Sequence, residues 1–212
     1  MRIDDAFNFK LNDDFGCNGD DDYDDYGWYN IYDLPEFNSE KDHIAHGVTK
    51  LVIFPFENPN FVIKLPFSGM WFMNEEDDYI FDRFTVIEDY CAEEADIYDE
   101  AVQEGIEEFF ASTKFGGFTK DGTAFYVSER VISFSRKEST SKDSYDKAKS
   151  LYSCLPTSWL ADAIEYYGFQ KVKHLINFLE EHDLKDFHSG NVGMREDGAP
   201  CLLDYSDFRE DF

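Results

Sequence analysis

The sequence DFHSGNVGMREDGAPCLLD occupies residues 186–204 and is the most informative stretch of the chain. Its turn residues at 195–198 stand between two short apolar runs, a pattern typical of a β-hairpin. Because a hairpin returns the chain to its starting point, Asn191 and Asp204 at its open end are predicted to lie close together. Carboxylate and amide oxygens suit a Mg²⁺ ion that carries phosphates. Asp186, five residues before Asn191, is expected at the same site as a base or a hydroxyl-positioning group.

A second hairpin is predicted upstream, from the β-rich runs at 48–54 (VTKLVIF) and 61–65 (FVIKL). A helical pattern follows from about Thr85 to Phe110, with apolar residues recurring at spacings of three and four. Glu94 falls on the apolar stripe of this helix. A carboxylate that faces a core is destabilising by several kcal/mol unless it finds a cation, and Lys64 in the second strand is the expected partner.

The remaining segments give the chain a mixed α+β pattern. Two strands are predicted at 115–119 and 123–132, a polar connector at 133–157, and two helices at 158–167 and 169–181. Thr157 or Ser158 is the expected cap of the first of these two helices. This order of strands, helices and a final hairpin predicts an α+β fold in two lobes.

The composition is strongly acidic. Asp and Glu number 46 against 19 Lys and Arg, which gives a formal net charge of −27. This charge argues against direct binding to nucleic acid or anionic lipid, and it would complement a basic protein partner. No apolar stretch approaches the ~20 residues that cross a bilayer, and the N-terminus lacks the apolar region of a secretory signal. We therefore expect a cytoplasmic protein without membrane contact, in which the four scattered cysteines are free thiols.

Residues 1–40 differ in composition from the rest of the chain. Residues 13–29 read DDFGCNGDDDYDDYGWY, which is acidic and has neither a helical nor a strand period. We expect this segment to form a solvated acidic surface or to dock a partner.

The pattern of Asp186, Asn191 and Asp204 resembles the catalytic segment of the protein-kinase-like superfamily, D-x-x-x-x-N followed by a metal-binding Asp. The separations of five and thirteen residues are common in that superfamily. The form D-x-H-x-G-N looks most like the aminoglycoside and choline kinase branch. Leu184 stands where the family usually has His, and Ser206 stands where it usually has Gly.

The resemblance implies an ATP site with Mg²⁺. Phe61-Val62-Ile63-Lys64 is similar to the V-A-I-K strand of kinases, so Lys64 would hold the phosphates and Glu94 would orient it. Asn191 and Asp204 would bind the metal, and Asp186 would accept or orient the acceptor hydroxyl. The single-glycine stretch 44–52 would cover the phosphates, and its candidate residues are Gly47, Thr49 and Lys50.

The resemblance also implies a domain division. Residues 1–40 would be an acidic segment, 41–132 a small N-lobe with an antiparallel sheet, and 133–212 a reduced helical C-lobe. The chain stops eight residues after Asp204, where typical kinases continue into an activation segment and further helices. This shortness argues against a protein substrate held by those elements.

Three functions follow from these observations. The first is an ATP- and Mg²⁺-dependent phosphotransferase whose acceptor, a small molecule or a protein, is not specified by the sequence. The second is a pseudokinase that serves as an interaction protein, with or without bound nucleotide. The third is an acidic mimic of nucleic acid. Compact kinase-like proteins of this kind, with a loop like HGVTKLV at 46–52, look similar to ones encoded by bacteriophages and mobile elements.

Overall fold

The computed structural model of the chain describes residues 43–46, 49–55, 58–66, 70–73, 79–82, 89–118, 124–135, 140–151 and 153–206. Strands and helices are mixed along the chain, as the α+β prediction requires. The chain divides into two compact units, one formed by 1–95 with 113–130 and the other by 96–112 with 131–212. The two units are described separately. The predicted acidic segment 1–40 and Gly47 lie outside the described residues.

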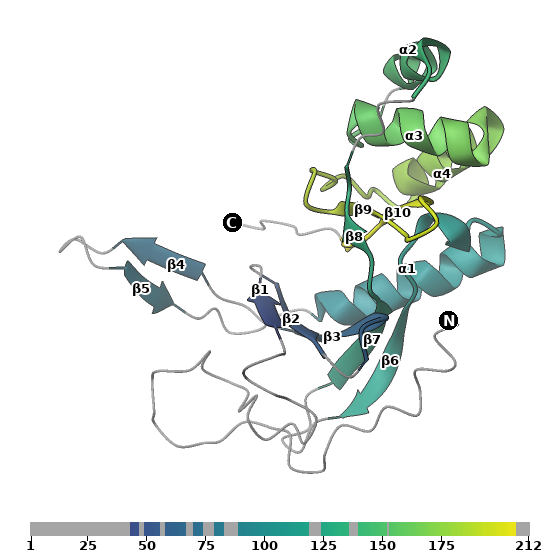
Figure 1. Cartoon of the computed structure of the whole chain (residues 1–212). Helices are drawn as coiled ribbons and strands as arrows, with labels where there is room; N and C mark the ends of the chain where they lie inside the picture. The colour runs from purple at the N-terminus through teal and green to yellow at the C-terminus, as the bar shows by residue number, and fades with distance from the viewer. Residues whose placement is uncertain are drawn as a thin grey trace, which may run out of the picture. The chain divides into compact units, whose positions relative to one another are not determined.

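The first unit contains a five-stranded sheet with the order β1-β2-β3-β7-β6, in which all neighbouring strands are antiparallel (Figure 1). The strands are β1 (His43–His46), β2 (Lys50–Phe54), β3 (Phe61–Pro66), β6 (Thr113–Phe118) and β7 (Ala124–Glu129). A separate pair is formed by β4 (Met70–Met73) and β5 (Tyr79–Asp82). The predicted hairpins β2–β3 and β6–β7 are confirmed. The short strands β1, β4 and β5 were not predicted, because four-residue runs give too little periodicity.

The register of the sheet separates a polar face from an apolar one. Val52 pairs with Lys64, and Lys64 pairs with Tyr126, so these side chains share one face. Their neighbours in sequence alternate to the other face, where the buried residues are Leu51, Ile53, Ile63, Leu65, Phe125 and Val127. The buried hydrogen-bonding side chains of the sheet therefore lie on the face that carries Lys64 and Tyr126.

Helix α1 (Tyr90–Glu104) lies in the sequence between β5 and β6. It starts after Asp89, whose Oδ1 accepts the backbone N–H groups of Cys91 and Ala92, both at 3.0 Å. The helix ends before Gly105, which has a left-handed φ of 70°, and a short 3₁₀ helix, η3 (Glu107–Phe109), comes next. The long helix predicted to reach Phe110 is thus shorter than expected at its C-terminal end.

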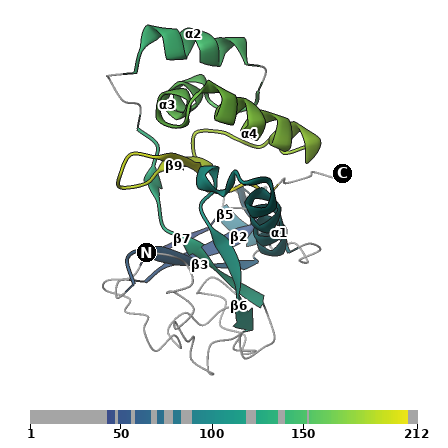
Figure 2. The same cartoon turned by 90° about the vertical axis from the view of Figure 1, so that its right-hand side faces the viewer.

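The second unit combines three helices with a small sheet (Figure 2). Its helices are α2 (Lys142–Ser150), α3 (Thr157–Tyr167) and α4 (Phe169–Glu181), and its sheet has the order β10-β9-β8, with β8 (Ile132–Ser133), β9 (Val192–Met194) and β10 (Pro200–Leu202). The predicted helices at 158–167 and 169–181 and the C-terminal hairpin are confirmed.

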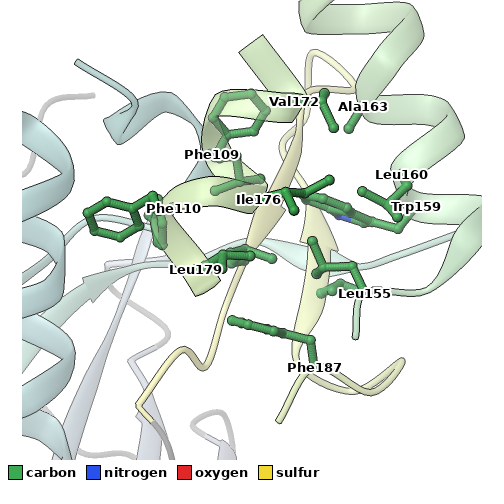
Figure 3. Close-up of a cluster of buried hydrophobic side chains, with 14 of the residues drawn as sticks. Phe109, Phe110, Leu155, Trp159, Leu160, Ala163, Val172, Ile176, Leu179 and Phe187 are labelled. Atoms are coloured by element: carbon green, nitrogen blue, oxygen red, sulfur yellow. The ribbon is translucent and has the colours of Figure 1, made fainter. Parts of the chain in front are cut away.

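The core of the second unit is built around Trp159 of α3 (Figure 3). This side chain is fully buried, and its Nε1 donates a hydrogen bond to the backbone oxygen of Gly193 in β9 at 3.3 Å. Phe109 and Phe110 after α1 and Leu179 of α4 belong to the same cluster. The hairpin that carries the candidate residues is therefore fixed to the helices by buried packing.

Two predictions in this region are wrong. The connector 133–157 contains α2, whose only buried residues are Ser144 and Ala148, so the helix shows no apolar stripe in the sequence. The N-cap of α3 is Pro156, without a side-chain hydrogen bond, because the helix already begins at Thr157. Thr157 and Ser158 therefore do not cap it.

Candidate functional site

The first group of candidate residues surrounds the carboxylate of Glu94, which is completely buried. Lys64 from β3 donates a hydrogen bond to Oε1, and the Thr113 hydroxyl donates to the same oxygen at 2.9 Å. Lys50 from β2 lies with its Nζ 2.9 Å from Oε2. The side chains of Lys50 and Lys64 are only 4% and 8% exposed. Two ammonium groups and a hydroxyl thus offset the burial of one carboxylate.

The register explains how two lysines reach one carboxylate. Lys50 pairs with Pro66 and Val52 pairs with Lys64, so the two lysines are diagonal neighbours on the same face of adjacent strands. Helical phase places Glu94 on the buried side of α1, opposite that face. The ion pair between Lys64 and Glu94 that the sequence predicts is confirmed.

Further polar groups lie on the same face. The hydroxyls of Thr113 and Ser128 are 2.9 Å apart, and both side chains are buried. The hydroxyl of Tyr126 donates to Oδ2 of Asp89 at 3.0 Å. None of these four residues was predicted from the sequence. For Thr113, Ser128 and Tyr126 the signal is the alternation of β6 and β7, and this does not say which strands become neighbours. For Asp89 the signal is its residue type, which is favoured directly before a helix.

Two of the residues expected to cover phosphates lie at the start of β2. Lys50 is the first residue of β2, inside the strand predicted at 48–54, and it is buried against Glu94. Thr49 lies directly before it and is half-buried.

The second group lies in the second unit, in the loop between α4 and β9. The Nδ2 of Asn191 donates to the backbone oxygen of Asp186 at 2.7 Å. Within the loop, the backbone N–H of Gly190 donates to Nδ1 of His188 at 2.9 Å, so the imidazole accepts there and carries its proton on Nε2. These hydrogen bonds thus hold Asp186 and Asn191 next to each other. The side chain of His188 is hydrogen-bonded to the backbone of the loop.

Asp204 lies next to this loop through the hairpin. The backbone N–H of Leu203 donates to the oxygen of Asn191 at 3.0 Å, which confirms that the open ends of the hairpin are adjacent. Oδ1 of Asp204 accepts the hydroxyl of Ser206 at 3.3 Å. Asp186 is exposed, whereas Asn191 and Asp204 are half-buried. One carboxylate and one amide oxygen are thus carried on neighbouring backbone segments.

The chemistry available at this second group is that of oxygen ligands. Among the described residues, no three His, Cys, Asp or Glu side chains are arranged to hold a metal ion by themselves. An ion bound by Asn191 and Asp204 would therefore complete its coordination with waters or with oxygens of a ligand, as Mg²⁺ does when it carries phosphates.

The part of the chain that the structure describes has no helix long and apolar enough to cross a membrane. Comparisons of the sequence with models of protein families and with curated proteins gave no match.

Proposed function

We propose that the protein is an ATP- and Mg²⁺-dependent phosphotransferase with a kinase-like, two-lobed arrangement. The observation that carries this proposal is the buried pair of Lys64 and Glu94. Protein kinases bind the phosphates of ATP with a lysine on a strand, and a glutamate on the following helix holds that lysine. Here too the lysine lies on a strand, β3, and the glutamate lies on the helix α1.

The proposal gives each group one task. The ammonium groups beside Glu94 neutralise the phosphates, and Asn191 and Asp204 hold the metal ion. The γ-phosphoryl group passes from the oxygen that bridges the β- and γ-phosphates of ATP to a hydroxyl oxygen of the acceptor. Asp186 accepts the hydroxyl proton, and ADP leaves with the electron pair of the broken P–O bond. Most of the acceleration then comes from positioning and from charge neutralisation.

The two groups belong to different units of the chain. Because the proposal gives each group its own task, substitutions in either group test it. We further infer a cytoplasmic location, since ATP-dependent chemistry and free thiols both suit that compartment.

A binding protein without transferase activity is the second candidate. The observation in its favour is Leu184, which is buried and apolar where the family that the sequence resembles usually has a histidine. A protein of this second kind would transfer no phosphate, with or without bound nucleotide.

The test is a thermal-unfolding titration with ATP, with and without Mg²⁺, followed by an assay for transfer of the γ-phosphate to hydroxyl compounds. At about 100 times the dissociation constant, a ligand that binds only the folded protein adds about 2.7 kcal/mol of stability. We expect a magnesium-dependent rise in Tm that Asp204→Asn removes and that the exposed control Asp99→Asn retains. A rise without transfer supports the second candidate. No rise at millimolar ATP contradicts the proposed phosphotransferase.

A further inference from the structure

The segment between Phe187 and Val192 is held by packing only at its two ends. Both of these residues are buried in the core of the second unit. The side chains between them are exposed, apart from the half-buried Asn191. Hydrogen bonds within the segment therefore set its conformation, rather than contacts with the core.

Two of these hydrogen bonds involve His188. The backbone N–H of Asn191 donates to the backbone oxygen of His188 at 3.0 Å, which closes a β-turn over residues 188–191. Inside this turn, the backbone N–H of Gly190 donates to Nδ1 of the imidazole at 2.9 Å. Asn and Asp side chains often accept the N–H two residues further along in the same way, and this bond stabilises a turn. The imidazole of His188 thus supports the turn from its own side chain.

Gly190 is the residue against which the imidazole lies. A Cβ at position 190 would be 2.7 Å from Cε1 and 3.0 Å from Nδ1 of His188. Non-bonded carbon atoms prefer separations of about 3.5–4.0 Å, so a side chain at this position would push the imidazole away. The hydrogen bond to Nδ1 would then be lost. The bond therefore needs both the histidine and the glycine.

The turn places the backbone of Asn191, and one further hydrogen bond orients its side chain. Nδ2 of Asn191 donates to the backbone oxygen of Asp186 at 2.7 Å. Because the nitrogen of the amide is the donor in this bond, Oδ1 is the atom that can act as a metal ligand. The position of Oδ1 thus depends on the turn that His188 and Gly190 support.

We propose that His188 is a positioning residue for the metal ligand Asn191 and that it acts through the N–H of Gly190. This inference rests on the proposed function, in which Asn191 and Asp204 hold the Mg²⁺ ion that carries the phosphates. It adds a group behind the ligands that sets the affinity for the metal complex. Replacing residues that orient metal ligands typically weakens metal binding about 10- to 100-fold.

The experiment uses two substitutions that separate the ring of His188 from its acceptor atom. His188→Phe keeps a ring without an acceptor, whereas His188→Asn has no ring but returns an acceptor for the N–H of Gly190. Isothermal titration gives the dissociation constant of ATP with and without Mg²⁺. With Mg²⁺, we expect His188→Phe to bind about 10-fold more weakly than the parent protein and His188→Asn to stay within about 3-fold of it. Without Mg²⁺, the three proteins should bind ATP alike.

A measurement without ligand tests the turn itself. Hydrogen exchange at the backbone N–H of Gly190, followed by NMR, should be faster in His188→Phe than in the parent protein, because the acceptor is gone. His188→Asn should restore slow exchange. Gly190→Ala should weaken the magnesium complex as His188→Phe does, and it takes the place of that variant if His188→Phe does not fold.

The matched control is His174→Phe, which makes the same replacement at a half-exposed position of α4. It should bind ATP with Mg²⁺ as the parent protein does. Since residues 188 and 190 are exposed, urea unfolding should give their variants nearly the same midpoint as the parent protein.

The outcomes separate this role from the proposed function. If His188→Phe binds the magnesium complex as tightly as the parent protein, or if His188→Asn binds as weakly as His188→Phe, the positioning role is wrong and the proposed function stands. An equal loss with and without Mg²⁺ also overturns the role, because the effect would then not pass through the metal ligand. If the parent protein binds no ATP, the proposed function and the positioning role both fail.

Discussion

The burial of Glu94 is the most demanding feature at the scale of single residues. A charged group that loses its contact with water is destabilising by several kcal/mol unless its surroundings replace that contact. In this protein two lysines and the hydroxyl of Thr113 take the place of water around the carboxylate. A glutamate on an exposed helix surface can usually be replaced with little loss of stability. Glu94, in contrast, lies at the centre of the buried charges of the first unit.

Replacing Glu94 by Gln should destabilise the protein by about 3–5 kcal/mol, because two buried ammonium groups lose their counter-charge. The free energy of unfolding in urea measures this change. Asp99→Asn, on the exposed side of the same helix, should stay within about 0.5 kcal/mol of the parent protein. A loss below about 1 kcal/mol for Glu94→Gln would show that the carboxylate is not buried as the structure has it.

The thiol of Cys91 should be unreactive in the folded protein. Burial raises the pKa of Cys91 well above its ordinary value, so the reactive thiolate is scarce at neutral and mildly alkaline pH. Cys154 is exposed and should react much faster. Labelling with iodoacetamide, followed by mass spectrometry of peptides, gives the rate at each cysteine.

Equal labelling rates for Cys91 and Cys154 in the native protein would contradict this placement. Labelling in urea is the control, since unfolding should bring the two rates together.

At the scale of elements, helix α2 begins with a side-chain cap. The hydroxyl of Ser141 accepts the backbone N–H of Ser144 at 3.1 Å, which caps the helix. Ser141→Ala should therefore lower stability by about 1 kcal/mol. Asp146→Asn, on the exposed surface of α2, is the matched control. Equal stability of the two variants would mean that the cap contributes nothing, and urea unfolding followed by circular dichroism measures both.

The β9–β10 hairpin should weaken in acid through its turn. Hydrogen bonds from the backbone N–H of Ala199 and from the hydroxyl of Tyr166 lower the pKa of Asp197. Because this pKa is lower in the folded than in the unfolded chain, Asp197 stabilises the fold fully above about pH 4 and less as pH falls through the folded value. The stability difference between the parent protein and Asp197→Ala should accordingly shrink in acid. A difference that grows as pH falls would contradict the assigned hydrogen bonds.

The success of sequence-based prediction varied between elements for physical reasons. Strands β2 and β3 and helices α3 and α4 were predicted because their apolar residues follow the period of their structure. The phase of α1 was enough to select Glu94. Helix α2 was missed because hydrogen bonds and charges support it rather than an apolar stripe.

Of the three described partners of Glu94, only Lys64 could be predicted from the sequence. Lys64 follows from its place on a strand, whereas Lys50 and Thr113 reach the carboxylate through the strand register. Register is set by pairing between segments far apart in sequence, and local pattern does not encode it.

At the scale of the whole molecule, the charge of −27 opposes the binding of free ATP, which is itself strongly anionic. A site for phosphates in such a protein requires local cations, and in the proposed function the lysines beside Glu94 supply them. A bound Mg²⁺ ion would neutralise further phosphate charge. The proposed function therefore implies that the magnesium complex of ATP is the form that binds.

Isothermal titration of ATP into the parent protein and into Glu94→Gln and Asp204→Asn, each with and without Mg²⁺, tests the proposed function most directly. We expect the parent protein to bind ATP at least about 10-fold more tightly with Mg²⁺ than without it. Asp204→Asn should lose this dependence on magnesium, and Glu94→Gln should weaken binding in both conditions. If the parent protein binds no ATP, or if Asp204→Asn keeps the full magnesium effect, the protein does not hold a nucleotide in the way proposed.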